Sequence, residues 1–167
     1  MLSTLIATLA LLSAPFQSAP FQSAPLQSAA GRQGPNADPQ PKQVRCDVQV
    51  ILSTAGAPDI APELRPIKRY LENSFGNRYS RFEHVSASRL LLGKDQRGGV
   101  SLPNGNQLSL TWLGAEDGLL RLAMEVGSLK TQVKVHDGGL FFQAGRKHKD
   151  GMLVVAIRVT AVGSAGP

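Results

Sequence analysis

The residues that most often carry enzyme chemistry are few in this sequence and widely spaced. The three histidines, His84, His136 and His148, show none of the close spacings of zinc ligands, such as i, i+2 in a strand or i, i+4 in a helix. His84 is expected at the surface or edge of a strand, and His148 in a solvated basic turn over residues 146–149. The single cysteine, Cys46, excludes a disulfide scaffold. We therefore expect no metal site and no cofactor.

Hydrolase motifs are also missing from the sequence. A nucleophilic serine needs a base beside it, and the Gly-x-Ser-x-Gly elbow that presents such a serine does not occur. Glu116 and Asp117 are adjacent acids in a turn predicted over residues 114–118, where acids more often solvate the turn than catalyse. The glycines at 138 and 139 open no helix, so a phosphate-binding loop is unsupported. A non-catalytic protein is the preferred interpretation, and a small secreted hydrolase with an unrecognised site is the alternative.

Positive charge is the one chemical asymmetry of the chain. The formal net charge is +6, which favours acidic partners without naming one. Eight basic residues but only three acidic ones lie between positions 65 and 97, with Tyr70, Tyr79 and Phe82 interleaved. The candidate anion-binding residues within this stretch are Arg65, Lys68, Arg69, Arg78 and Arg81.

This basic stretch has two interpretations. The simpler one is a solvated helix face beside aromatic core residues. The other is a footprint for an anionic partner, either an envelope protein or an anionic glycan or lipid. Basic residues with interleaved aromatics can also bind single-stranded nucleic acid, but we do not expect that partner, because an exported protein would meet nucleic acid only outside the cell or during DNA uptake.

The N-terminal part of the chain is predicted to direct export. Residues 2–14 are uncharged and apolar or small, a length typical of the core of a signal peptide and too short for a membrane span. Ala-Pro repeats then recur every five residues, from positions 14, 19 and 24. We predict a signal peptide over residues 1–30 with cleavage after Ala30, and a disordered Pro-rich linker over residues 31–44. The mature protein would have no integral membrane span and lie in the periplasm or outside the cell.

The segment that follows must position the basic residues. Residues 45–53 alternate between apolar and polar side chains, which predicts a half-buried strand. Cys46 is on its apolar phase, so we expect a buried thiol; a pair between two chains is the alternative. A helix is predicted next, with its basic face opposite an apolar stripe, Pro66 delaying or kinking its start and Gly76 at its end. The stripe consists of Ile60, Leu64, Ile67 and Leu71.

From residue 81 onward the apolar period becomes two, which is typical of strands. Asn104-Gly105 between two alternating runs is a hairpin signal, because both residues tolerate positive φ. Further strands are predicted over residues 82–92, 100–102, 107–113, 120–126, 129–135, 140–144 and 152–162, with a turn over 145–151. The predicted fold is mainly β (α+β), an antiparallel sandwich or open barrel with one helix after the first strand. It forms a single domain over residues 45–163, before a tail at 164–167.

Three segments of this region resemble small exported bacterial β-rich proteins of unknown function. They cover residues 100–105 (VSLPNG), 138–142 (GGLFF) and 151–157 (GMLVVAI). The likeness extends over the β-rich part of the chain and consists of turn and core features. It implies a bacterial envelope setting and carries no active residue with it. The preferred hypothesis is therefore a non-catalytic exported binding or assembly module of a bacterial envelope.

Overall fold

The computed structural model describes residues 41–163, apart from the side chain of Arg146. The predicted signal peptide and the tail at 164–167 lie outside the described residues, as do residues 31–40 of the predicted linker. The first strand begins at Gln43, two residues before its predicted start. Val44, assigned to the linker from the sequence, is therefore a fully buried strand residue.

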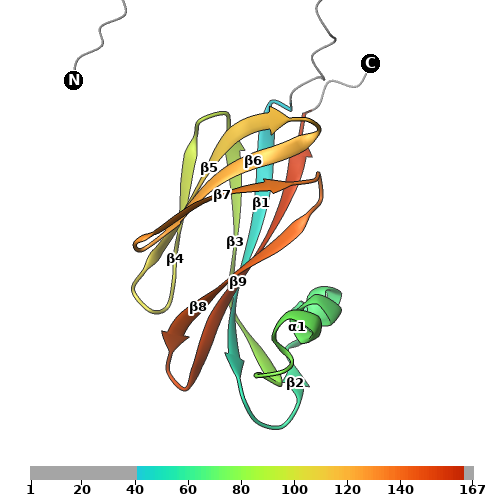
Figure 1. Ribbon diagram of the computed structural model, residues 1–167, viewed down its shortest axis with the longest axis vertical. Helices are drawn as coiled ribbons and strands as arrows, with labels where there is room; N and C mark the ends of the chain where they lie inside the picture. Colours follow the sequence, from blue (N-terminus) through green and yellow to red (C-terminus); the bar gives the residue numbers. More distant parts are fainter. Residues whose placement is uncertain (1–40, 164–167) are drawn as a thin grey trace, which may run out of the picture. The chain divides into compact units, whose positions relative to one another are not determined.

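The described chain is a mainly β fold of two packed sheets with a short helix after the first strand, and it is not a closed barrel (Figure 1). This confirms the predicted fold class. One sheet, called sheet A below, has the strand order β2-β3-β1-β9-β8, and the other, sheet B, has the order β4-β5-β6-β7. All pairs are antiparallel except the two-residue parallel pair of β2 with β3. The elements are β1 (Gln43–Thr54), β2 (Asp59–Ile60), the 3-10 helix η1 (Pro62–Ile67), α1 (Lys68–Phe75), β3 (Arg81–Gly93), β4 (Arg97–Ser101), β5 (Gln107–Glu116), β6 (Leu119–Val126), β7 (Leu129–Val135), β8 (Leu140–His148) and β9 (Gly151–Val162).

The main core lies between the two sheets. Alternate residues of β1, from Val44 through Cys46 to Val50, face sheet B and are fully buried. Leu122 of β6 and Ile157 of β9 are likewise fully buried, so the predicted phases of these strands are correct. Complete burial of each such aliphatic side chain stabilises the fold by roughly 1.5–3 kcal/mol. The burial of Cys46 also confirms the preferred interpretation of its thiol.

A second apolar cluster lies on the other face of sheet A, under the helical segment. Ile51 of β1 and Val154 of β9 are fully buried there against Leu71 of α1. The rings of Phe75 and Phe142 meet edge to face with centroids 5.8 Å apart, an arrangement that aromatic pairs favour. The predicted apolar stripe is therefore the surface that attaches the helix to the sheet.

The helical segment starts differently from a simple amphipathic helix. Residues from Pro62 to Ile67 form a 3-10 helix, and the α-helix begins only at Lys68. Pro66 explains the delay that the sequence predicted, because proline cannot donate a backbone hydrogen bond inside a helix. Gly76 follows α1 as its C-cap, in a right-handed conformation with φ −59°.

The β4–β5 hairpin confirms its prediction, with Gly105 at φ +79°. Two other predicted turns are shorter than the sequence indicated. Between β5 and β6, pairing continues through Glu116, and the chain reverses only at Asp117 and Gly118, where φ is +54° and +72°.

The predicted turn over residues 145–151 is the second correction. Strand β8 continues to His148, with a register shift between Ala144 and Arg146, and the turn is confined to Lys149 and Asp150. The shift absorbs Gly145, which has φ +111°. A bulge of this kind lets a strand continue past a residue that cannot pair, and alternation along a sequence does not reveal it.

Candidate functional site

Two of the predicted basic residues, Arg65 and Lys68, line a groove between β2 and the helical segment. Its volume is about 450 Å³, and its lining includes Ile60 and Phe82 together with Arg65 and Lys68. Leu64 and Leu71 attach the helical segment to sheet A. Residues three and four positions apart on a helix are neighbours, which brings Arg65 and Lys68 together.

Carboxylates accompany two of the five predicted cations. Lys68 Nζ lies 3.6 Å from Glu72 Oε1, and Arg81 Nε lies 3.6 Å from Asp59 Oδ2. Both pairs are about half exposed, so each contributes less than about 1 kcal/mol. Glu72 and Asp59 also line the groove, which lowers its net positive charge.

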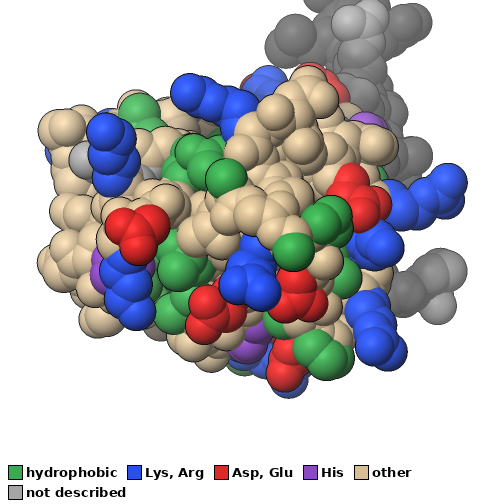
Figure 2. Space-filling model, turned by 90° about the horizontal axis from the view of Figure 1, so that it is seen from below, with side chains coloured by type: hydrophobic (Ala, Val, Ile, Leu, Met, Phe, Trp, Pro, Cys, Tyr) green, Lys and Arg blue, Asp and Glu red, His purple; other side chains and the backbone are tan. Residues whose placement is uncertain are grey.

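The other three predicted cations, Arg65, Arg69 and Arg78, form no ion pair within residues 41–163. Only Arg65 of these three lines the groove. Figure 2 views the end of the molecule at which α1 lies in Figure 1, and basic side chains there stand among acidic and hydrophobic ones. The surface is therefore mixed, and its unpaired positive charge is on the helical segment and the loop after it.

The groove does not contain a recognisable catalytic arrangement. Ser80 and Asp59 line it, but no histidine does, and Ser80 Oγ donates a hydrogen bond to the Gly56 carbonyl. His84 lies on β3, at the edge position expected for it, and its buried Nε2 has no hydrogen-bond partner in the described part of the chain. No cluster of three metal-ligating side chains occurs between residues 41 and 163.

The buried thiol is unsuited to nucleophilic chemistry. Burial raises the pKa of Cys46 to about 12, and the negative charge of the neighbouring Asp47 adds to the effect. Because the thiolate is the nucleophile of cysteine chemistry, this residue stays inert at neutral pH.

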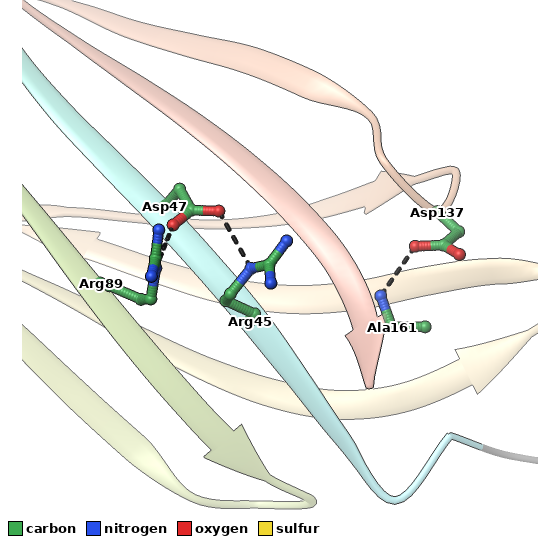
Figure 3. Close-up of polar contacts among 5 residues, drawn as sticks. All are labelled: Arg45, Asp47, Arg89, Asp137 and Ala161. Carbon is green, nitrogen blue, oxygen red and sulfur yellow. Dashed lines mark hydrogen bonds and ion pairs between the residues drawn. The ribbon is translucent and has the colours of Figure 1, made fainter. Parts of the chain in front are cut away.

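A second charged cluster, which sequence reasoning missed, lies on the outer face of sheet A. Asp47 accepts hydrogen bonds from Arg45 Nε at 3.1 Å and from Arg89 Nε at 2.7 Å, one at each carboxylate oxygen (Figure 3). Asp47 also stands directly opposite Arg158 in the register of β1 with β9. We call the row Arg158–Asp47–Arg89, which crosses three adjacent strands, the charge ladder.

The arginines determine the acidity of Asp47. Partial burial alone would raise its pKa, but the hydrogen bonds and positive charges of Arg89 and Arg45 outweigh burial and lower the pKa below its usual value. Asp47 therefore stays ionised and holds Arg45 and Arg89 by their Nε atoms. A groove of about 140 Å³ beside the ladder, lined by Asp47, Arg158 and Glu63 among others, connects this face with η1.

The sequence carried a signal for this cluster, although not for its geometry. Arg158 is the only charged residue in the apolar run over residues 152–162. Arg45 and Asp47 are both on the polar phase of β1, so alternation places them on the same face of the sheet. Which strands lie beside β1 cannot be deduced from alternation, so the meeting of these residues could not be predicted.

Comparison of the chain with family models, with curated proteins and with solved structures found no match. None of the helices in residues 41–163 has the length and apolar character needed to cross a membrane. The function must therefore be argued from the surfaces of the molecule itself.

Proposed function

We propose that this protein is a non-catalytic binding module, exported to a bacterial envelope, that holds an anionic partner on its basic helix face. The residues of this face are Arg65, Lys68, Arg69, Arg78 and Arg81. The observation that carries the proposal is the charge of Arg65, Arg69 and Arg78, which form no ion pair within residues 41–163. Arg65 also lines the groove, whose lining includes the apolar side chains of Ile60 and Phe82. Such a surface attracts anions at long range and offers contact area at short range.

The alternative, a small secreted hydrolase, lacks a supporting observation. No histidine lines the groove, the Ser80 hydroxyl donates its hydrogen bond to the Gly56 carbonyl, and the thiol is buried and protonated. General base catalysis requires a titratable group within hydrogen-bond reach of the nucleophile. A binding role, unlike catalysis, requires only a groove of suitable charge and shape.

Binding to immobilised heparin, as a model polyanion, tests the helix face. The double variant Arg65→Glu and Arg69→Glu reverses two cations that have no carboxylate partner in the described residues, and should weaken binding about tenfold or more at low salt. The matched control is Lys42→Glu with Lys94→Glu. This control changes the net charge by the same amount. Lys42 precedes β1 and Lys94 follows β3, at the end of this strand pair where Gln43 pairs with Gly93.

The two double variants give a clear decision. A much smaller loss in the control supports a localised site. Equal losses would show a general effect of net charge, and the helix face would have to be abandoned. Added salt should weaken wild-type binding steeply, because exposed charges are screened within about 10 Å at 0.1 M.

Export is tested separately. We expect the protein recovered from the periplasm or the medium to begin near Gly31, because Ser28-Ala29-Ala30 supplies small residues before that position. N-terminal sequencing of the recovered chain measures this directly. A chain that remains in the cytoplasm with Met1 intact would contradict the exported part of the proposal.

A further inference from the structure

The edge of β3 is open over most of its length. Strand β2 pairs with β3 only at Arg81 and Phe82, and no other described strand is hydrogen-bonded to that side of β3. The backbone groups that point outward from residues 83–92 thus form an unpaired sheet edge, which ends where Gly93 bonds to Gln96. Such an edge is a template for an added strand unless it is protected.

The other sheet edges carry devices that discourage pairing. Edge strand β7 bears Lys130 and Lys134, and lysines on an edge oppose strand addition. Edge strand β4 is only five residues long, and edge strand β8 has a register shift near its end.

Strand β3 lacks most of these devices. Its register shift lies near its start, opposite Val50 and Ile51, and the segment over residues 86–92 contains no proline and no lysine. Two of its large apolar side chains are also exposed: Leu91 is 54% exposed and Val85 39%. This edge is therefore the one best suited to pairing.

The charge ladder ends at this edge. It reads positive, negative, positive from Arg158 through Asp47 to Arg89, and the Arg89 side chain is 72% exposed. Figure 3 shows Arg89 and Arg45 meeting Asp47 on β1. Laterally opposed residues on adjacent strands contact each other, and opposite charges there are stabilising. The next strand in the row would extend the alternation with a negative residue beside Arg89.

The guanidinium of Arg89 is also held in an orientation that suits such a contact. Its Nε is bound to Asp47 Oδ1, so the guanidinium is oriented while its two terminal nitrogens have no partner among the described residues. A guanidinium can bind a carboxylate through two parallel hydrogen bonds. A groove of about 360 Å³, lined by Asp47, Gln49, Ala87 and Arg89 among others, leaves the Arg89 side chain accessible on this face of β1 and β3.

We propose that the free edge of β3 receives an extended segment of a partner protein by strand addition, with an Asp or Glu of that segment beside Arg89 and an apolar residue beside Leu91. The main-chain hydrogen bonds would supply affinity, and Arg89 and Leu91 would select the sequence. This surface is separate from the helix face, so either proposal can fail without the other.

Two synthetic extended peptides serve as probes. Both alternate Thr and Val; one carries Asp at its centre and the other Lys. Wild-type protein should bind the Asp peptide more tightly. Arg89→Glu should weaken binding of the Asp peptide about tenfold and strengthen binding of the Lys peptide. Fluorescence anisotropy measures both affinities, and a gain for the Lys peptide cannot arise from misfolding.

The matched control is Arg97→Glu. Arg97 is also an exposed arginine on an edge strand and pairs with one carboxylate, that of Glu125. We expect this variant to bind both peptides as the wild type does. Hydrogen exchange should also show slowed amides among residues 83–92 when the Asp peptide is bound.

Three results would overturn the proposal. They are a wild type that does not bind the Asp peptide, equal effects of Arg89→Glu and Arg97→Glu, and amide protection on another edge. Because Arg89→Glu also places a negative charge beside Asp47, the neutral variant Arg89→Gln is measured as well. It should lose the preference for Asp over Lys without gaining the reverse preference.

Discussion

The outer face of sheet A has two halves that differ in what covers them. In the half under η1 and α1, the outward residues Ile51 and Val154 are apolar and fully buried. In the other half, the outward residues of the same two strands are polar, and include Asp47 and Arg158. One pair of strands therefore serves as core in one half and as a charged surface in the other.

The difference shows how the sequence encodes a partial cover. Along β1, buried and half-buried residues alternate as far as Val50, and then Ile51 and Leu52 follow without a polar residue between them. Strands buried on both faces lose their alternation. The end of alternation thus marks the place where the helix begins to cover the sheet.

The largest expected effect comes from placing one charge in each half. Ile51→Asp would bury an unpaired carboxylate and should destabilise the fold by about 3–5 kcal/mol. Thr160→Asp places the same group in the open half, opposite Arg45, and should change stability by less than about 0.5 kcal/mol. Denaturant unfolding followed by the fluorescence of Trp112, the single tryptophan and 1% exposed, measures both. Similar midpoints would mean that the helix does not cover Ile51.

A smaller effect is expected from truncating one leucine in each half. Leu71→Ala removes a fully buried side chain of the helix and should cost about 2–5 kcal/mol, through lost burial and the cavity left behind. Leu91→Ala, on the exposed edge, should cost less than about 0.5 kcal/mol. The same unfolding assay compares them. A Leu91 variant as unstable as the Leu71 variant would show that the β3 edge is packed against something.

The smallest effect concerns the pH dependence of the open half. The folded pKa of Asp47 is lowered by Arg89 and Arg45 against the opposing effect of burial. Its contribution to stability is therefore present at neutral pH and is lost as the pH falls through that folded value. Asp47→Asn should remove this part of the acid sensitivity, less than about 1 kcal/mol for a pair near the surface. Unfolding curves between neutral and acidic pH test this, and identical pH profiles for variant and wild type would contradict it.

The sequence predicted those features that depend on local pattern. Alternation predicted β1 and the burial of Cys46, helical spacing predicted the attachment of Leu64 and Leu71, and Asn104-Gly105 predicted its hairpin. The turn lengths were wrong where bulges at 113 and 145 let strands continue.

The candidate sites were predicted less completely. Helical spacing placed Arg65, Lys68 and Glu72 on one face of the helix, but it gave no sign that Asp59 would share their groove. The ladder joins Asp47 to Arg89, which is 42 residues away in the sequence. Alternation identifies the face on which a side chain lies and says nothing of the neighbouring strand, so long-range pairs of this kind require the structure.

The most direct test of the helix face is an NMR titration of the mature, isotopically labelled protein with a heparin oligosaccharide. We expect the largest shifts for backbone amides in residues 62–81, with weaker binding as salt is added. Largest shifts around Lys42 and Lys94, or shifts spread evenly over all basic residues, would contradict it.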